Sequence, residues 1–458
     1  MTHMDWAPLL KAAGRIPMVK RLGRVSAVEN GLVEVSGLGV DASHGDQVLI
    51  SRRAGPPIMG EVVRLGGDRL TALPESSPEG VALGDRVSLE KAATIAPGDG
   101  WIGRIIDPMG RPLDGRILAE GAEAKPLKAS PIPPAERTLL GDRLETGMMA
   151  FNTLLPIVQG QRIGLFAGSG VGKSSLLAHF ACHMQADVVV LALIGERGRE
   201  LGEFVRNVLG PEGLSRTVIV ASTSDQSPLM RRRCAWTAMA VAEYFRDMGR
   251  QVLFLADSLT RFAEAHREVA VATGELPTMR GYPPSLAHQL MSLCERAGPG
   301  REGGGTITAI LSVLVAASDM EEPVADILRG VLDGHVVLDR AIAERGRYPA
   351  VDLLRSVSRS LPTAASEGEN EMISQARSLL SLYEKSQLMI DAGLYEEGRN
   401  IELDRAVVAW AELDSFISAK EPRDTSHSFE KLRLILRKAQ SFQPHGRRRR
   451  ENDVDLRR

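Results

Sequence analysis

The strongest chemical signal in this sequence is a glycine-rich stretch, residues 167–174 (Ala-Gly-Ser-Gly-Val-Gly-Lys-Ser), between an apolar run and a helical stretch. Glycines let backbone N–H groups turn inward around a phosphate, and a helix N-terminus adds partial positive charge. Lys173 can reach the β- and γ-phosphates of a nucleotide, and Ser174 can ligate Mg²⁺. The strict pattern begins with glycine, and Ala167 is a mild departure at a position that we expect to supply a turn. The pattern predicts a phosphate-binding loop made of Gly168, Ser169, Gly170, Val171, Gly172, Lys173, Ser174 and Ser175.

Two carboxylates end apolar, β-favouring runs. Asp257 follows the run 252–256, and a carboxylate at the C-terminal edge of a central strand can hold magnesium beside Ser174. Glu196 ends another apolar run and suits the task of orienting or polarising an attacking water. Arg197 could stabilise phosphate charge. From the motif alone, a structural ion pair between Glu196 and Arg197 is an equally good interpretation.

Two further side chains stand at the ends of the segment 348–359. Tyr348 could stack on adenine, and Arg359 could act as an arginine finger that reaches the site of a neighbouring subunit. Spacing alone indicates no more than a surface tyrosine and a surface arginine.

The hydrophobic pattern predicts the elements that position these residues. Short strands separated by turn signals such as Asn30-Gly31 predict a small β-barrel over residues 21–92. From about 141 to 360, apolar strands that alternate with helical stretches predict a mainly parallel sheet covered on both faces. With the Gly- and Pro-rich connection before it, this sheet belongs to a domain that we place over 93–364. Helical spacing predicts a helical domain over 365–441. We expect a short N-terminal segment over 1–20 and a basic, disordered tail over 442–458.

The composition is that of an ordinary soluble protein. The 458 residues are 43% hydrophobic and 25% charged, with a net charge of −2, which gives no global electrostatic case for binding nucleic acid or membrane. The three cysteines have no C-x-x-C spacing and predict neither a disulfide framework nor a zinc site. We find no signal peptide and no membrane-spanning run, so we expect a cytoplasmic protein. The run 447–450 (four arginines) could touch acidic lipid or nucleic acid, although a solvated tail is the favoured interpretation.

Taken together, residues 165–177, 196–197, 257–261 and 348–359 resemble the catalytic family that includes the rotary ATP synthase β subunit, and the resemblance covers nearly the whole chain. It implies an α/β fold in which a RecA-like P-loop ATPase core follows an N-terminal β-barrel and precedes a C-terminal helical domain. It implies a ring of six that hydrolyses ATP with Mg²⁺. Non-catalytic α subunits lack a carboxylate at the position of Glu196, so the chain resembles a hydrolysing subunit. The roles implied are catalysis for Lys173, Glu196, Arg197, Arg261 and Arg359, adenine stacking for Tyr348, and metal binding for Ser174 and Asp257.

Two stretches, 274–285 and 322–335, resemble flagellar and injectisome (type III) protein export ATPases more than rotary β subunits, and the flagellar branch is our first choice. That resemblance implies a homohexamer located peripherally at the membrane export apparatus. The implied partners are a stator-like export regulator docked through residues 1–20, a central stalk protein, export chaperones with their substrates, and the membrane export gate. A rotary catalytic subunit is an alternative that would need a non-catalytic partner. An RNA-binding translocase is disfavoured, and no nucleic acid is expected, because residues 21–90 contain no Phe, Tyr or Trp.

Overall fold

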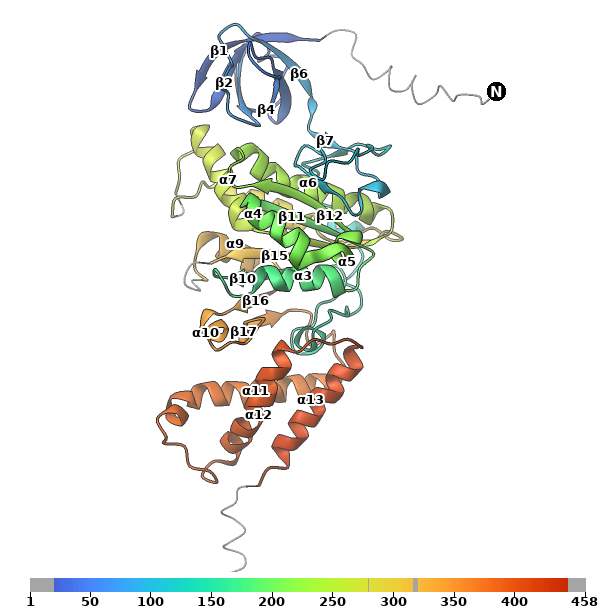
Figure 1. Ribbon diagram of the computed structural model, residues 1–458, viewed down its shortest axis with the longest axis vertical. Helices are drawn as coiled ribbons and strands as arrows, with labels where there is room; N and C mark the ends of the chain where they lie inside the picture. Colours follow the sequence, from blue (N-terminus) through green and yellow to red (C-terminus); the bar gives the residue numbers. More distant parts are fainter. Residues whose placement is uncertain (1–19, 279, 316–319, 444–458) are drawn as a thin grey trace, which may run out of the picture.

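The protein is elongated, and its three parts follow one another in chain order, with a β-barrel at one end, a sheet flanked by helices in the middle and a helical part at the other end (Figure 1). This computed structural model describes residues 20–443 apart from residues 279 and 316–319. The expected regulator-docking segment (1–20, apart from Lys20) and the arginine run 447–450 lie outside the described residues. The architecture confirms the predicted fold class, whereas the exact domain limits stay predictions.

The barrel closes in the strand order β1-β2-β5-β4-β3-β6. Asn30 and Gly31 both have left-handed backbone conformations, with φ of 52° and 78°, which is what a tight turn between β1 and β2 requires. Alternate side chains such as Val33 and Val35 point inward and fill the barrel. The strands are β1 (Leu22–Glu29), β2 (Leu32–Ser36), β3 (Asp46–Ile50), β4 (Ile58–Gly66), β5 (Arg69–Pro74) and β6 (Arg86–Ala92).

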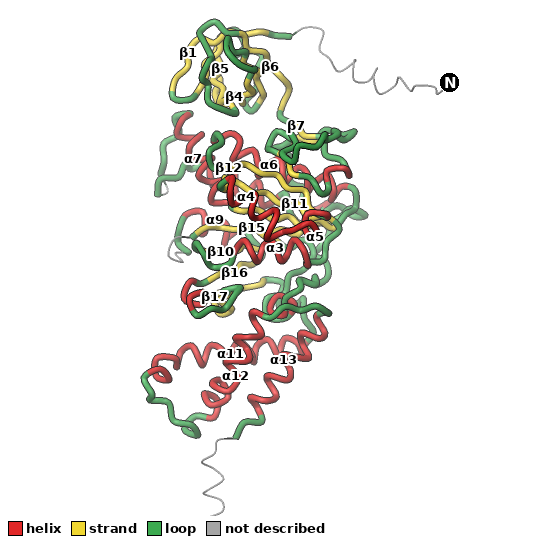
Figure 2. The backbone as a smooth tube through the Cα atoms, in the orientation of Figure 1, coloured by secondary structure: helices red, strands yellow, loops and turns green. Residues whose placement is uncertain are grey.

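The central sheet has the strand order β17-β16-β10-β15-β13-β11-β12-β8. Figure 2 shows its strands, among them β11, β15, β10, β16 and β17, between the barrel and the C-terminal helices. Its neighbouring strands are parallel except at one edge, where β17 runs antiparallel to β16, and at the short β14 (Gly298–Pro299) beside β15. Parallel strands buried on both faces are apolar along their buried length, as β11 is up to Gly195. The main strands are β8 (Ile105–Ile106), β10 (Arg162–Ala167), β11 (Val188–Glu196), β12 (Thr217–Thr223), β13 (Gln251–Asp257), β15 (Thr306–Leu314), β16 (Gly334–Leu338) and β17 (Val351–Ser358).

Helices cover both faces of this sheet, and each face has its own hydrophobic core. One core packs the sheet against α3 (Lys173–His183) and continues into the helical part of the chain. The other packs it against α6 (Pro228–Asp247), α7 (Leu259–Ala272), α8 (Ser285–Glu295) and α9 (Pro323–Val331). Shorter helices are α2 (Met149–Asn152), α4 (Gly198–Glu203), α5 (Gly210–Ser215) and α10 (Arg340–Glu344), and Phe204–Leu209 forms a π-helical turn.

Three helices form the C-terminal part: α11 (Glu367–Asp391), α12 (Ile401–Ser418) and α13 (Thr425–Gln440). Their starts follow from local sequence. Ser366 and Glu369 form a reciprocal capping box at α11, and the side chains of Asn400 and Asp424 cap α12 and α13. Across the described part of the chain, no helix combines the length and the apolar character that a membrane crossing requires.

Candidate active site

The phosphate-binding loop lies between the end of β10 and the start of α3. Gly170 and Gly172 have φ of 78° and 88°, a left-handed conformation that disfavours other residues, so the loop depends on these two glycines. Ala167, where we expected a turn, is instead the last residue of β10 and pairs with β15 and β16, so no glycine is required there. The side chain of Val171 is buried in the core, so only its backbone is available to a nucleotide.

Lys173 and Asp257 meet because β10, which leads into the loop before Lys173, and β13, which ends at Asp257, end at the same edge of the sheet. The ammonium group of Lys173 forms an ion pair with Oδ1 of Asp257, and their side chains are only 11% and 5% exposed. The hydroxyl of Ser312, on β15, donates to the same Oδ1 at 2.8 Å. The carboxylate is thus held at the floor of the loop, beside the residue that begins α3.

A β-bulge presents Glu196. The pairing of β11 with β12 shifts register after Ile194, where Gly195 has a φ of 66° and donates its N–H to the hydroxyl of Ser222 at 3.2 Å. A bulge of this kind re-aims the side chain that follows it. Burial, together with the negative charge of Asp257, raises the pKa of Glu196 above the ordinary value of 4.5. A carboxylate with a raised pKa is a better proton acceptor, which suits a general base.

The two predicted arginines of this edge differ in their surroundings. Arg197 is 79% exposed and pairs with Glu200 at 2.9 Å, so the ion pair with Glu196 that we considered is not formed. Arg261, in the first turn of α7, donates from Nη1 to Glu264 at 3.1 Å, while its Nε is buried and has no hydrogen-bond partner. A buried, unsatisfied donor on a cation is a good position for an anionic ligand.

Most of the predicted site residues line one cavity of about 1040 Å³. Tyr348 lies at the loop, since a Cβ placed on Gly172 would come within 3.0 Å of its ring, and half of this side chain is exposed. Except for Val171, Asp257 and Arg359, every predicted site residue contributes to the wall: Gly168, Ser169, Gly170, Gly172, Lys173, Ser174, Ser175, Glu196, Arg197, Arg261 and Tyr348.

The sequence interpretation missed the far end of the cavity. His179 and His183, one turn apart on α3, lie with ring centroids 4.6 Å apart, and Ser418 and Lys420 come from the end of α12 and just beyond it. Burial, with a smaller effect of His183, lowers the pKa of His179 to about 4, so that ring is neutral at pH 7. The i, i+4 histidines on the helix after the loop were a readable signal, whereas nothing in the local sequence marked Lys420.

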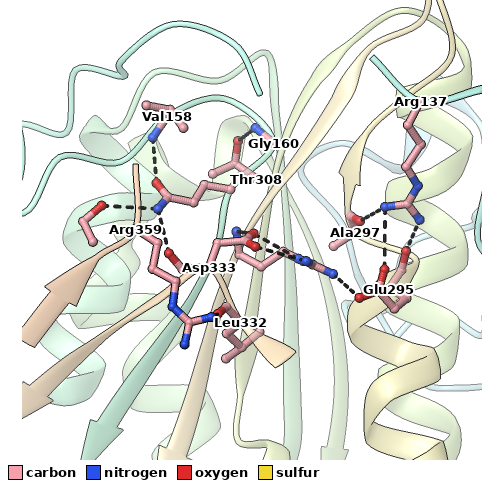
Figure 3. Close-up of polar contacts among 12 residues, drawn as sticks. Arg137, Val158, Gly160, Glu295, Ala297, Thr308, Leu332, Asp333 and Arg359 are labelled. Atoms are coloured by element: carbon pink, nitrogen blue, oxygen red, sulfur yellow. Dashed lines mark hydrogen bonds and ion pairs between the residues drawn. The ribbon is translucent and has the colours of Figure 1, made fainter. Parts of the chain in front are cut away.

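Arg359 does not reach this cavity. It follows β17, whose last residue, Ser358, pairs with Gly334 at the start of β16. Because β16 is parallel to β10, Arg359 lies at the amino-terminal edge of the parallel strands, and Lys173 lies beyond the opposite edge. The guanidinium donates to the carbonyl of Leu332 at 3.0 Å (Figure 3). The chain therefore carries its loop and its candidate finger on opposite edges of one sheet.

The donor set fits Mg²⁺ bound together with a nucleotide. Ser174 offers a hydroxyl exposed in the cavity, and Asp257 offers a carboxylate at the same sheet edge. Mg²⁺ prefers oxygen ligands and is usually held by one or two protein side chains plus the substrate phosphates. Among the residues that the structure describes, no cluster of three or more His, Cys, Asp or Glu could hold a metal ion by itself.

Comparison with known proteins agrees with this geometry. Residues 147–358 match the ATP synthase alpha/beta family, nucleotide-binding domain, and residues 365–434 match the T3SS EscN ATPase C-terminal domain. The chain is 41% identical over 433 residues to the flagellum-specific ATP synthase of Salmonella typhimurium, which covers 92% of this chain and 94% of that protein. It is 42% identical over 401 residues to the flagellum-specific ATP synthase of Bacillus subtilis, covering 87% of this chain and 91% of that protein.

Solved structures give the same result. The assembled ATPase EscN from the type III secretion system of enteropathogenic E. coli superimposes with a TM-score of 0.83 at 34% identity, over 90% of this chain and 100% of that one. EscN in complex with its central stalk EscO superimposes with the same TM-score, at 35% identity, over the same shares of both chains. This chain is therefore a P-loop ATPase that belongs to the family of the flagellum-specific ATP synthases.

Proposed function

We propose that this chain hydrolyses ATP as the ring ATPase of a flagellar type III protein export apparatus, with each active site completed by a neighbouring copy. One observation carries the proposal: a single chain has a nucleotide cavity at one edge of its sheet and Arg359 at the other. Copies arranged head to tail around a closed ring would bring the sheet edge that carries Arg359 in one chain to the cavity of the next chain. A rotary ring built of two kinds of subunit would not need both features in one chain.

The chemistry assigned to the cavity follows from its charges. When ATP binds, Lys173 would turn from Asp257 to the β- and γ-phosphates, and Asp257 and Ser174 would hold a magnesium ion. A magnesium ion bound there would neutralise charge on the phosphates. Glu196, whose pKa is raised by burial and by Asp257, orients the attacking water and accepts its proton. Arg261 offers its unsatisfied Nε to the phosphate region.

Two further residues complete the proposed site from its ends. Tyr348 stacks on adenine above Gly172, with half of its side chain free to contact a base. Arg359 of the neighbouring copy stabilises the charge that develops on the transferred phosphoryl group. Arg197 is assigned a weaker role in phosphate stabilisation, because it is largely exposed and paired with Glu200.

The proposed partners follow from the relatives. EscN is described as assembled and as bound to its central stalk EscO, which supports a homohexamer with a central stalk for this chain. We extend the proposal to a stator-like regulator, export chaperones with their substrates and the membrane export gate, at the cytoplasmic face of the membrane. The flagellum-specific relatives favour the flagellar branch, whereas the match of residues 365–434 is shared with an injectisome ATPase.

Purified chain alone tests this function. The specific ATPase activity should rise with protein concentration as rings form, and Lys173→Ala should abolish the activity without preventing ring formation. Activity that appears only after a distinct second subunit is added would favour the rotary alternative. Affinity purification from the source cells then tests the branch, since flagellar structural proteins should co-purify, and needle proteins in their place would overturn the flagellar assignment.

A further inference from the structure

The backbone that carries Arg359 is fixed by the residue just before β16. The N–H of Arg359 donates to the carbonyl of Asp333 at 3.0 Å, one step beyond the last pair of the β16–β17 ladder. The side-chain amide of Gln161 donates to the same carbonyl at 3.1 Å and lies 3.3 Å from the hydroxyl of Ser358. Asp333 is therefore the point at which the end of β17 meets the start of β10.

The carboxylate of Asp333 is in turn locked by Arg162, the first residue of β10. The backbone N–H and Nε of Arg162 donate to Oδ2 at 2.9 and 3.0 Å, and its Nη2 donates to Oδ1 at 3.1 Å. The N–H of Asp333 donates back to the carbonyl of Arg162 at 2.8 Å. Such a forked, charge-assisted pair is geometrically specific. The remaining terminal nitrogen of Arg162 donates to Glu295 on α8 at 2.6 Å (Figure 3).

The guanidinium of Arg359 rests on the C-terminal end of α9. Its Nη1 donates to the carbonyl of Leu332 at 3.0 Å, and its Nη2 lies 3.4 Å from the carbonyl of Arg329. Carbonyls at a helix C-terminus lack partners within the helix and carry partial negative charge, so they hold a cation without neutralising it.

From this geometry we propose that Asp333 is a positioning residue for the arginine finger: through the Arg162–Asp333 fork it holds the backbone of Arg359 while the end of α9 supports the guanidinium. The inference rests on the proposed function, in which Arg359 acts on the site of a neighbouring chain. Asp333 lies at the sheet edge that carries Arg359. Substituting Asp333 therefore affects catalysis in the neighbour's cavity and leaves the nucleotide affinity of its own chain unchanged.

Matched variants separate this role from a general structural one. Asp333→Asn and Glu295→Gln each remove one carboxylate charge from Arg162, but only the first touches the support of Arg359. We expect Asp333→Asn to lower the kcat of assembled rings by about 10²-fold, as a small misplacement of a catalytic group does, with KM and the nucleotide affinity of the unassembled chain unchanged. Glu295→Gln should keep the wild-type kcat. Asp333→Glu, which retains the charge, should recover part of the loss.

A double-mutant comparison decides whether Asp333 acts through the finger. Arg359→Ala and Arg359→Ala/Asp333→Asn should have the same kcat, because a residue that positions the finger has nothing left to position once the finger is gone. Further loss in the double variant, reduced nucleotide affinity, or a wild-type kcat for Asp333→Asn would overturn the inference. If Arg359→Ala itself keeps wild-type activity in confirmed rings, the finger claim of the proposed function fails and this inference fails with it. If only Arg359→Ala is impaired, the finger claim stands and the role of Asp333 is refuted.

Discussion

Removing Lys173 should destabilise the site when no nucleotide is bound, because the buried carboxylate of Asp257 loses its ion-pair partner. Asp257 is 4% exposed, and without Lys173 its retained partner is the hydroxyl of Ser312. Removing one partner of a buried ion pair costs roughly 3 to 5 kcal/mol, and we take the lower end, about 3 kcal/mol, because truncating the lysine lets water from the cavity reach the carboxylate. Lys173→Ala/Asp257→Asn removes the unpaired charge as well, so it should recover a substantial part of that loss.

Native-state hydrogen exchange measures this effect locally, which is necessary in a chain with three structural parts. Without nucleotide and Mg²⁺, amides of β13 and the first turns of α3 should exchange roughly 10²-fold faster in Lys173→Ala than in wild type. Amides of the β2–β5 ladder in the barrel provide the internal control and should not change. Unchanged protection in Lys173→Ala, or a double variant that exchanges as fast as the single one, would refute the idea that Lys173 neutralises Asp257 in the resting site.

Three other predictions concern the buried ion pair between Glu61 of the barrel and Arg232 of α6, and the stacking of adenine on Tyr348. Glu61→Gln should lower stability by about 3 to 5 kcal/mol, measured by thermal unfolding, because the buried Arg232 loses the negative charge of its partner on β4. Burial alone would raise the pKa of Glu61, but the charges of Arg232 and Lys128 outweigh burial and lower that pKa below 4.5. The stability advantage of wild type over Glu61→Gln should therefore shrink as the pH falls below 4.5. A stability advantage that does not shrink as the pH falls further would contradict this. Tyr348→Ala should weaken nucleotide binding by about 1 to 3 kcal/mol in a titration, while Tyr348→Phe, which keeps the ring, should bind like wild type.

Local patterns were sufficient to predict the parts of the site that depend on one strand and its following turn. The loop from Gly168 to Ser174 depends on residues adjacent in sequence, and Asp257 and Glu196 each end an apolar run. Parallel strands place their carboxyl ends at one edge, so the meeting of these groups followed from the fold class. The hairpin at Asn30-Gly31 was readable for the same reason, since its turn chemistry is local.

Features that depend on pairing between distant segments could not be predicted from the sequence. Glu61, with its partners Lys128 and Arg232, joins the barrel to the core across three separate stretches of the chain, and no spacing marks them. Lys420 reaches the cavity because it forms an isolated β-bridge with Met148, which also lines the cavity. The antiparallel pairing of β17 with β16 sends Arg359 to the edge away from the loop, and a one-dimensional pattern does not carry strand direction.

Shared active sites are the central claim, and a mixing measurement tests them most directly. Glu196→Gln chains should be inactive because their own cavities lack the base, and Arg359→Ala chains should lose about 10³- to 10⁵-fold in turnover because they offer no finger. In rings assembled from an equal mixture, about one quarter of the sites should combine an intact Glu196 with a neighbour's intact Arg359, so partial activity should return. Mixed rings that form normally but recover no activity at any ratio would contradict the account.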